Sequence, residues 1–519
     1  MGLFKKKNNH PSGLLIAYGT KTGNAKLVAR QTQKYYAKNG LKAVCKNMAK
    51  LKPEALQRYP TVLLVVSTQG EGEPPASALR FFRALHDPSM PHLRNIRYAV
   101  CALGDSGYEK FCETGKQLDR RLAELGAVPL CKRVDCDVEF SETAIQWIKT
   151  TAALLCHTSG GELPNDAMVA SEKKYCASIK QRLKLTSSHE VAPVCHLVLD
   201  LNDTDLSYQP GDSLKFIPQN PSGLVDALCN YLHLDSNDVA VRQQLLRAYE
   251  ITSVSKKTLQ ALAGCTQSQR LHDTLQTPVC KELLARANVY DILTDFKLNV
   301  DAETLLGLLP PIKAREYSVA SSPAMFPNEI HLTIKTIRFN YKQRRHEGAG
   351  SVYANESLQP GTRLEFSMAS NPAFCLPASA HAPLILIGVS TGIAPFRAML
   401  QHKESGALSG EMWLIYGNKF RSKDFLYENE LKGFVDRGVL NRIDTAFSRD
   451  NDSMKYVQDI ILDQKEAMLD WLGRGAHVYL CGSIKMGQSV RQAVHRITAD
   501  TAYSPENLME TQRWFEDVY

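Results

Sequence analysis

The chain has 519 residues, of which 44% are hydrophobic and 22% charged, and it carries a net charge of +8. At about 100–200 residues per domain, this length predicts about three domains. The composition excludes a disordered, collagen-like or disulfide-stapled protein, and the lack of any run of about 18 uncharged apolar residues excludes an integral membrane protein.

The thirteen cysteines are scattered, with no C-x-x-C pair and no His/Cys cluster at metal spacing. They predict reduced thiols in a cytoplasmic protein without a metal site. The positive charge is concentrated near the N-terminus, because residues 13–157 hold 21 Lys and Arg against 13 Asp and Glu. This excess indicates an acidic partner surface, although a solvated lysine-rich face is the commoner cause.

Residues 12–157 alternate short apolar runs with helical patterns. The runs at 14–18, 61–67 and 97–103 are nearly continuous in hydrophobicity, which is typical of strands buried on both faces of a parallel sheet. Each run is followed by a glycine-rich loop and a helical stretch. We therefore expect an α/β domain with a doubly wound parallel sheet, followed at 158–172 by a polar linker with Gly and Pro.

From residue 173 the pattern becomes that of antiparallel strands separated by turns. It predicts a β-barrel domain over residues 173–377, with strands at 194–201, 213–218, 330–337 and 363–368. Leucines at helical spacing predict a helix-rich insert over about 221–310.

After residue 377 the alternation of strands and helices returns. Strands are expected at 383–388, 411–417, 439–446 and 476–481, each followed by a helix-like stretch. This rhythm predicts a second α/β domain over residues 378–519.

Three loops of the first domain follow its predicted strands, and the carboxyl ends of parallel strands meet at one edge of a sheet. The first loop offers hydroxyls, backbone N–H groups and a helix N-terminus to a phosphate, although a plain Thr/Gly turn with a helix cap is the alternative. The third loop presents an aromatic ring. Together they predict a site for a flat, phosphorylated ring. The residues are Thr20, Lys21, Thr22, Gly23, Asn24 and Ala25, then Ser67, Thr68, Gln69 and Gly70, then Leu103, Gly104, Asp105, Ser106, Gly107, Tyr108, Glu109, Lys110, Phe111 and Cys112.

These loops resemble the FMN-binding module of NADPH-dependent diflavin reductases. The segments STQGEGEPP at 67–75 and LGDSGYEKFC at 103–112 are similar to those of the sulfite reductase flavoproteins within that family. The resemblance implies that residues 20–25 hold the FMN phosphate, and that the other two loops flank the isoalloxazine, with Tyr108 stacking on it. It also implies a flavodoxin-like domain, a ferredoxin-reductase-like FAD barrel with a helical connecting insert, and a Rossmann-like NADP-binding domain.

The middle domain continues the resemblance. Tyr208–Asp212 reads YQPGD, similar to the family's YxPGD turn, and Arg315, Glu316, Tyr317 and Ser318 match its R-x-Y-S motif. A guanidinium suits a pyrophosphate, an aromatic face suits a flavin, and a hydroxyl suits the neighbourhood of its reactive N5, although an Arg–Tyr pair on a strand is often structural. The resemblance implies further FAD contacts at Thr333, Ile334, Lys335, Phe339, Gly348, Ala349, Gly350, Ser351 and Tyr519.

The last domain resembles the family's nucleotide-binding domain. Residues 388–397 are similar to a G-x-G-T-G-I-A-P-F-R loop, with Ser390 in place of the middle glycine. Ser448 and Arg449 resemble the pair that holds the 2′-phosphate, but Met454 stands where the family has a lysine. The resemblance implies an NADPH site formed by Thr391, Gly392, Ser448, Arg449, Lys455, Tyr456, Gln458 and Cys481.

Two segments of this domain imply the residues that act on the hydride. Cys481 begins the sequence CGS, similar to the family's C-G-D, and residues 516–519 match the family's terminus. The resemblance implies catalytic roles for Ser318, Cys481 and Asp517, with Tyr519 stacking over the FAD ring and moving aside for the nicotinamide. The alternatives are a buried core thiol for Cys481 and a frayed tail for Tyr519.

The resemblance implies an NADPH-dependent oxidoreductase that passes electrons from NADPH to FAD, to FMN and then to a siroheme/iron–sulfur hemoprotein subunit, for the reduction of sulfite to sulfide. No nucleic-acid or membrane partner is expected. One alternative is a free-standing diflavin reductase for another metalloprotein, such as a cytochrome P450 or methionine synthase. Another is a flavin carrier with a defective nicotinamide site, which Ser390, Met454 and Ser483 support.

Overall fold

The computed structural model describes residues 13–21, 23–70, 72–105, 108, 110–137, 140–157, 173–202, 204, 206–235, 237–371, 374–450, 455–499 and 501–519. The predicted linker at 158–172 and Met454 lie outside these residues. The chain divides near residue 172 into two compact units, each described here by itself. No helix in the described part is long and apolar enough to cross a membrane.

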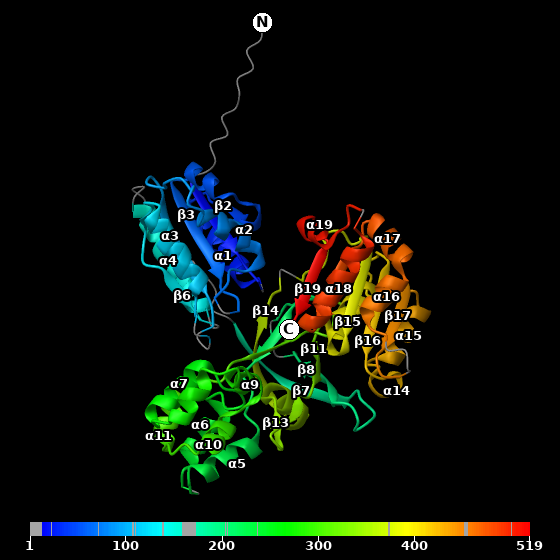
Figure 1. Ribbon diagram of the computed structural model, residues 1–519. Helices are drawn as coiled ribbons and strands as arrows, with labels where there is room; N and C mark the ends of the chain where they lie inside the picture. The colour runs from blue at the N-terminus through cyan, green and yellow to red at the C-terminus, as the bar shows by residue number, and fades with distance from the viewer. Residues whose placement is uncertain are drawn as a thin grey trace. The chain divides into compact units, whose positions relative to one another are not determined.

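The first unit is a doubly wound α/β domain (Figure 1). Its main sheet has the order β2 (Val44–Asn47), β1 (Leu14–Gly19), β3 (Thr61–Ser67), β4 (Arg97–Leu103) and β5 (Val128–Pro129), and β6 (Val134–Cys136) also pairs with β4. All pairings are parallel. The order 2-1-3-4-5 is that of flavodoxin-like folds, as predicted.

Helices cover both faces of this sheet because successive strand residues alternate between the faces. Ile16 and Leu63 pack under α1 (Asn24–Lys38) and α4 (Ser141–His157). Leu15 and Leu64 pack under α2 (Ala76–Leu85) and α3 (Glu113–Glu124), together with the short helices η1 (Met48–Lys50) and η2 (Pro53–Arg58). The near-continuous apolar runs in the sequence therefore reflect burial on both sides.

The second unit begins with an antiparallel barrel, as predicted. The strand order is β10 (Arg315–Ser318), β9 (Ser213–Phe216), β14 (Arg363–Ala369), β7 (Lys174–Lys184), β8 (Val194–Asp200) and β11 (Glu329–Lys335). A bridge between Val319 and Leu332 joins the two ends of this order and closes the barrel. The sequence did not reveal β7 and β10, because neither has a clear apolar alternation.

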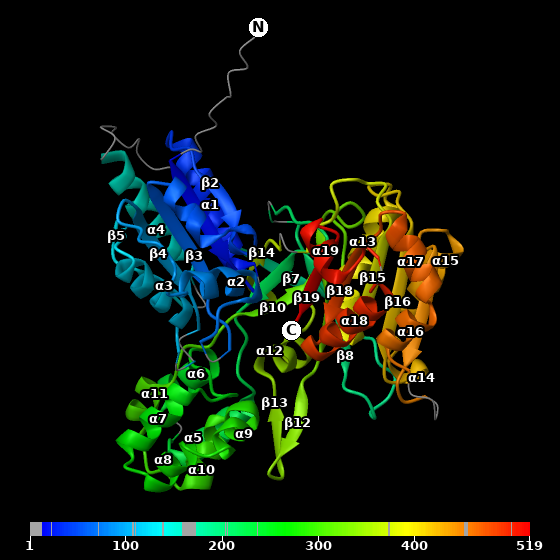
Figure 2. The same ribbon diagram turned by 45° about the horizontal axis from the view of Figure 1, so that its top comes forward.

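A polar hairpin, β12 (Arg338–Tyr341) with β13 (Arg344–Glu347), was also missed, because its strands are rich in arginine. Figure 2 shows its two strands side by side. A short helix follows, α12 (Ala349–Val352), and it continues into a π-helical turn, η3 (Tyr353–Ser357).

A helical insert lies between β9 and β10 in the chain, where the leucine spacing predicts it, and it has a core of its own. Its helices are α5 (Ser222–Tyr231), α6 (Val239–Arg247), α7 (Lys256–Cys265), α8 (Gln269–Leu275), α9 (Val279–Arg286), α10 (Val289–Phe296) and α11 (Ala302–Leu308). Asn288 and Asp291 form a capping box at the start of α10. The buried Asp291 also pairs with Arg344, which ties the hairpin to the insert.

The last domain has a parallel sheet of order β17 (Arg442–Phe447), β16 (Met412–Asn418), β15 (Leu384–Val389), β18 (His477–Gly482) and β19 (Trp514–Val518). This order is Rossmann-like. The helices are α13 (Ala394–Glu404), α14 (Arg421–Asp424), α15 (Glu428–Asp436), α16 (Val457–Asp463), α17 (Lys465–Gly473), α18 (Ile484–Ile497) and α19 (Pro505–Glu510), with a short helix η4 (Ser390–Ile393) after β15.

Two details of this domain differ from the sequence-based expectation. β17 begins at Arg442 rather than 439, because the N–H groups of Val439 and Leu440 bond to the carbonyl of Phe434 and finish α15. The final residues form a strand of the sheet, β19, which pairs with β18.

Candidate functional site

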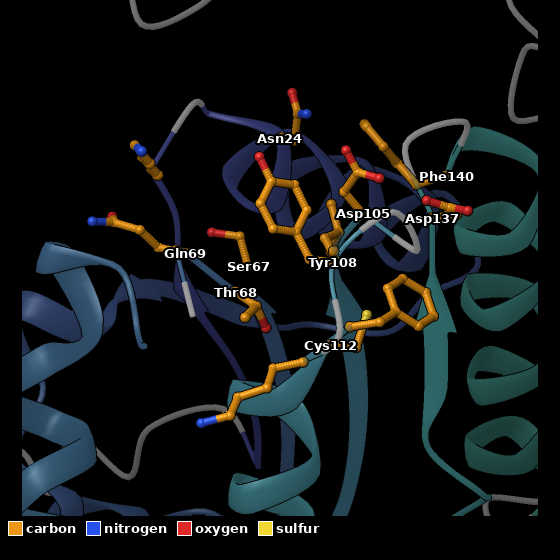
Figure 3. Close-up of a pocket in the computed structure, with 15 residues that line it drawn as sticks. Asn24, Ser67, Thr68, Gln69, Asp105, Tyr108, Cys112, Asp137 and Phe140 are labelled. Atoms are coloured by element: carbon orange, nitrogen blue, oxygen red, sulfur yellow. The ribbon is translucent and has the colours of Figure 1, made fainter. Parts of the chain in front are cut away.

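A cavity of about 270 Å³ opens at the carboxyl edge of the first unit's sheet, where the three predicted loops meet. In Figure 3 the ring of Tyr108 stands in the middle of the group, with Ser67 and Gln69 to one side and Asp105 and Asp137 to the other. The lining residues are Lys21, Asn24, Ser67, Thr68, Gln69, Gly70, Leu103, Gly104, Asp105, Tyr108, Lys110, Phe111, Cys112, Asp137 and Phe140.

Most of the predicted residues thus lie together, and some do not line the cavity. Thr20 and Gly23 shape its first loop, and Ala25 is fully buried in the core beneath it. Sequence reasoning missed Asp137 and Phe140, which follow β6 without a glycine-rich signal. The predicted residues Thr22, Ser106, Gly107 and Glu109 lie outside the described residues.

The first loop is held in the form of an anion cradle. The hydroxyl of Thr20 accepts the N–H of Gly23 at 2.9 Å, and Ser77 bonds both the N–H and the carbonyl of Thr20 at 2.8 Å. Gly23 has φ of 97°, a left-handed conformation that favours glycine, immediately before α1 begins. The free N–H groups of the first turn of α1 therefore lie beside Lys21 and Asn24, which suits a phosphate.

The pocket fits a phosphorylated flavin. The hydroxyl of Ser67 is buried at the wall of the cavity and has no hydrogen-bond partner in the described chain, so it is available to a bound polar ring. Tyr108 is 57% exposed and leaves its ring free for stacking. A Cβ at Gly104 would lie 2.8 Å from the backbone nitrogen of Cys112, so the third loop needs a glycine there to fold back on itself.

The second candidate site lies on the barrel, around Arg315 and Tyr317 of β10. A Cβ on Gly350 would lie 2.7 Å from Arg315 Cγ and from the Tyr317 hydroxyl, so α12 approaches this pair closely only because the residue is glycine. Ser351 accepts the N–H of Ile337 at 2.9 Å and fixes the loop. The guanidinium and the start of α12 thus suit a pyrophosphate, the group that the resemblance expects here.

Sequence reasoning missed the partner of Arg315. Its Nη2 lies 2.6 Å from Oε2 of Glu250, which is 7% exposed and also accepts the N–H and hydroxyl of Thr252. Glu250 precedes Arg315 by 65 positions and belongs to the insert region, so no local motif pointed to it. A pyrophosphate at Arg315 has to compete with this carboxylate.

The other predicted FAD contacts are spread around the barrel. Tyr317 stacks on Phe216 with 5.3 Å between ring centroids, whereas Glu316 faces outward near Lys215. Ile334 packs in the barrel core. The side chains of three further residues do not reach Arg315: Thr333 bonds to Tyr427, Lys335 lies 3.4 Å from the Ser390 hydroxyl, and Phe339 stacks on His346.

The three predicted catalytic residues lie together. Ser318 Oγ donates to Oδ2 of Asp517 at 2.7 Å, and the Cys481 thiol lies 3.8 Å from the same oxygen. They come from β10, β18 and β19, so the cluster joins the barrel to the last domain. Burial raises the pKa of Asp517, while the hydrogen bonds from Ser318 and Cys481 oppose that rise. Burial and the neighbouring Asp517 also raise the pKa of Cys481, which keeps it a thiol.

The terminal Tyr519 is anchored in the sheet edge rather than frayed. Its N–H bonds to the carbonyl of Gly482 at 3.0 Å, and its hydroxyl lies 3.1 Å from that of Thr391. The side chain is 62% exposed. The C-terminal aromatic therefore stands beside the loop predicted to bind the nucleotide.

The nucleotide loop carries one strained residue and one closely packed glycine. Ser390 has φ of 56°, so the position where the resemblance expects glycine indeed has a left-handed backbone. A Cβ on Gly392 would lie 2.2 Å from the carbonyl oxygen of Cys481, so this loop touches β18 directly. Both residues belong to the short helix η4, which leads directly into α13.

The predicted 2′-phosphate residues lie after β17 and around α16. The N–H groups of Ser448 and Arg449 bond to the carbonyls of Asn418 and Lys419, and the side chain of Arg449 is exposed. Lys455 pairs with Asp463 at 2.9 Å, and Tyr456 and Gln458 stand at the start of α16. Sequence reasoning missed Lys419 and Arg421, which bring two more cations to the loop after β16.

A buried polar layer joins the barrel to the last domain. Tyr427 bonds to His196 at 2.8 Å and to Thr333 at 2.6 Å, and Arg397 lies 3.1 Å from His331 and 2.7 Å from Glu430. Burial, together with the nearby Arg397 and His331, lowers the pKa of His196 to about 2. Burial also lowers the pKa of His331.

Known protein families match the chain domain by domain. A flavodoxin model matches residues 16–147, an FAD-binding domain model matches 167–284 and 236–353, and an oxidoreductase NAD-binding domain model matches 386–492.

Curated relatives match nearly the whole chain. A Bacillus subtilis protein is 34% identical over 493 residues, which are 91% of this chain and 82% of the relative. A Vibrio cholerae protein is 35% identical over 541 residues (98% and 87%), and one from Cronobacter sakazakii is 34% identical over 540 residues (98% and 90%). Each bears the name sulfite reductase [NADPH] flavoprotein alpha-component.

Proposed function

Because this chain belongs to the diflavin reductase family, among the sulfite reductase [NADPH] flavoprotein alpha-components, we propose that it carries electrons from NADPH to a hemoprotein partner that reduces sulfite to sulfide. The observation that carries the proposal furthest is the cluster of Ser318, Cys481 and Asp517. This cluster is a partly buried, polar hydrogen-bond network between the barrel and the nucleotide-binding sheet, where a hydride would have to pass.

The chain is an NADPH-dependent flavoprotein oxidoreductase that uses FMN, FAD and NADPH. The bound cofactors supply the redox chemistry, which is hydride acceptance and the transfer of single electrons. The protein binds them, orients them and excludes water. Lys21, Asn24 and the start of α1 would hold the FMN phosphate, with Tyr108 against the ring.

On the barrel, Arg315 and the start of α12 would hold the FAD pyrophosphate, with Arg315 leaving Glu250. In the last domain, Thr391, Gly392, Ser448 and Arg449 would hold the nucleotide. The remaining predicted contacts, from Thr333 to Ser351 and at Lys455, Tyr456 and Gln458, stay predictions. Lys455 pairs with Asp463 at the exposed surface, and a bound phosphate would share its ammonium with that carboxylate.

The cluster would act by holding protons at defined atoms. Oδ2 of Asp517 accepts from both Ser318 and Cys481, so the hydroxyl and the thiol are aligned by one oxygen. Neither side chain then needs to reorganise when charge develops beside it. Burial and the neighbouring Asp517 raise the pKa of Cys481, which favours the protonated thiol and suits a contact to a neutral ring.

The proposed domain boundaries are 12–157, a linker at 158–172, 173–377 and 378–519. The division of the chain into two compact units near residue 172 supports the boundary between the linker and the domain that begins at residue 173. We further propose a cytoplasmic protein, which the reduced thiols support, because the cysteines whose side chains the structure describes form no disulfide.

The test is an anaerobic absorbance titration of the holoenzyme with NADPH, with NADH as the control. We expect NADPH to bleach two flavins per chain, and flavins that stay oxidised would favour the flavin carrier. Ser318→Ala and Cys481→Ala should each slow flavin reduction without loss of FAD; unchanged rates in both would contradict the catalytic assignment. Adding the hemoprotein subunit should give sulfide from sulfite, whereas a free-standing reductase would give none.

A further inference from the structure

The charges of the first unit are segregated along the chain. Residues 13–70 hold ten cations and a single acid, Glu54, whereas residues 71–157 hold eleven cations and twelve acids. We call these ten cations the basic face. They are Lys21, Lys26, Arg30, Lys34, Lys38, Lys42, Lys46, Lys50, Lys52 and Arg58.

The fold gathers the basic face around the β2 edge of the sheet, with α1 covering one face of the sheet there and η1 and η2 the other. Its residues lie on or beside α1, β2, η1 and η2, and β2 is the edge strand. Nine of the ten cations are exposed, and Lys26 is half-buried. Lys50 apart, none of them pairs with a carboxylate of the described chain. Cations that are not paired with acids produce a positive potential, which extends about a Debye length into solution.

The basic face reaches the pocket. Lys21 lines the cavity, and β2 runs parallel to β1 with Asn47 opposite Tyr18, so Lys46 lies near the same edge of the sheet. Across the cavity the lining residues include Asp105 and Asp137. The pocket therefore has Lys21 on the β2 side, whereas the β4 and β6 side carries the two acids Asp105 and Asp137 together with one cation, Lys110. This uneven distribution of charge orients a charged partner as well as attracting it.

Residues 173–519 hold 38 cations and 38 acids, so they are neutral as a whole. The side chains of the basic face also favour a protein partner over a nucleic acid or a lipid surface. No large apolar or aromatic side chain of residues 13–70 is exposed in the described structure, so the face has neither rings for stacking on bases nor apolar groups for insertion into lipid.

From these observations we infer that the basic face docks the acidic surface of an electron-accepting protein beside the pocket. The inference rests on the proposed function and names the chemistry of the partner. Charge complementarity between the basic face and the acidic partner raises the rate at which the two proteins associate. We therefore expect this rate enhancement at low ionic strength and its loss at high salt, which screens the charges.

The experiment compares two hemoprotein acceptors of opposite charge, acidic cytochrome b5 and basic cytochrome c, with the NADPH-reduced holoenzyme. The face variant is Arg30→Glu/Lys46→Glu/Lys52→Glu. The matched control, Arg94→Glu/Arg120→Glu/Lys132→Glu, reverses three exposed cations outside the basic face and changes the net charge equally. Second-order rates are measured at about 20 mM and about 500 mM salt, where screening lengths differ several-fold.

We expect the ratio of the cytochrome b5 rate to the cytochrome c rate to fall at least tenfold in the face variant at low salt, less than threefold in the control, and little in either at high salt. Equal loss in both variants would overturn the inference in favour of net charge alone. Face-dependent binding of a DNA duplex or of anionic vesicles at about 150 mM salt, with no preference between the cytochromes, would overturn it in favour of those partners. If NADPH reduces neither the flavins nor the cytochromes, the proposed function fails instead.

Discussion

The pocket of the first unit and the Ser318 cluster of the second differ in how far apart in sequence their residues lie. The pocket is lined by short loops that each follow a strand of one sheet. The cluster joins strands of two domains, and its central hydrogen bond spans 199 positions of the chain. A site of the first kind depends on local turn chemistry, whereas one of the second kind depends on whole domains packing in register.

This difference predicts where each site is fragile. Changes that shift the packing of the barrel on the last domain should disable the cluster and leave the pocket intact, because the residues that line the pocket all belong to the first unit. Four experiments test whether the pocket and the cluster fail independently, and the largest effect is expected in the nucleotide loop.

Gly392→Ala should be the most damaging. A Cβ 2.2 Å from the Cys481 carbonyl has to push either the nucleotide loop or β18 aside, which displaces Cys481. A shift of about 1 Å costs roughly 100-fold in rate, so we expect FAD reduction by NADPH to slow by about that factor in stopped-flow measurements. FMN content should stay complete. Gly307→Ala, with nothing within 4 Å of the new methyl, is the control and should change neither.

Ser318→Ala and Asp517→Asn should distinguish the loss of the hydrogen bond between Ser318 and Asp517 from the loss of the titrating carboxyl group of Asp517. Loss of a hydrogen bond to a carboxylate is worth about 1.5–3 kcal/mol, or roughly tenfold to hundredfold in rate. The bond from Ser318 lowers the pKa of Asp517, so its removal raises that pKa, and the acid limb of the pH–rate profile should move to higher pH. Asp517→Asn should abolish the limb. A profile that is identical in all three proteins would exclude Asp517 as its origin.

Acid should destabilise the second unit before the first. The pKa of His196 is about 2 in the fold, against about 6.5 when exposed, so below pH 6.5 the unfolded chain binds a proton that the fold does not. The stability is present above pH 6.5 and falls by about 1.4 kcal/mol per pH unit below it. Thermal unfolding followed from pH 7.5 to 5 checks this, with loss of FAD and FMN measured separately.

Two histidine variants test whether His196 is the group that makes the second unit sensitive to acid. His196→Asn should flatten the pH dependence of the second unit, whereas His233→Asn, at an exposed left-handed position that asparagine tolerates, should not. Equal slopes in the two variants would mean that the buried layer around Tyr427 is not the acid-sensitive element.

The smallest effect is expected at the backbone. Ser390→Gly should stabilise the nucleotide loop by about 1 kcal/mol, because it relieves a non-glycine residue at φ of 56°. The reciprocal change in the first unit, Gly23→Ala at φ of 97°, should destabilise by a similar amount and weaken FMN binding. Differential scanning calorimetry of both variants tests the pair, and a loss of stability in Ser390→Gly would contradict the strain.

The sequence predicted what short-range patterns determine. Apolar runs such as 61–67 gave the parallel strands, and the loops at 20–25, 67–70 and 103–112 gave most of the pocket. It missed elements whose residues lack a pattern. The hairpin from Arg338 to Glu347 is polar on both strands, and only two of the eleven residues of β7 are buried.

Long-range pairs were equally out of reach. Glu250 gives no local sign that it meets Arg315, and Tyr427 gives none that it meets His196 and Thr333. The grouping of Ser318, Cys481 and Asp517 was predicted only through the resemblance to a family. No spacing in the sequence indicates that three strands so far apart share one oxygen.

That shared oxygen makes the cluster sensitive to the spacing between the barrel and the last domain. Oδ2 of Asp517 connects the barrel, through Ser318, to the nucleotide-binding sheet, through β19. If the two domains moved slightly apart, each could stay folded and keep its own ligand, but the hydrogen bond between Ser318 and Asp517 would break. Such a small separation would leave secondary structure unchanged and would reversibly slow the entry of electrons from NADPH.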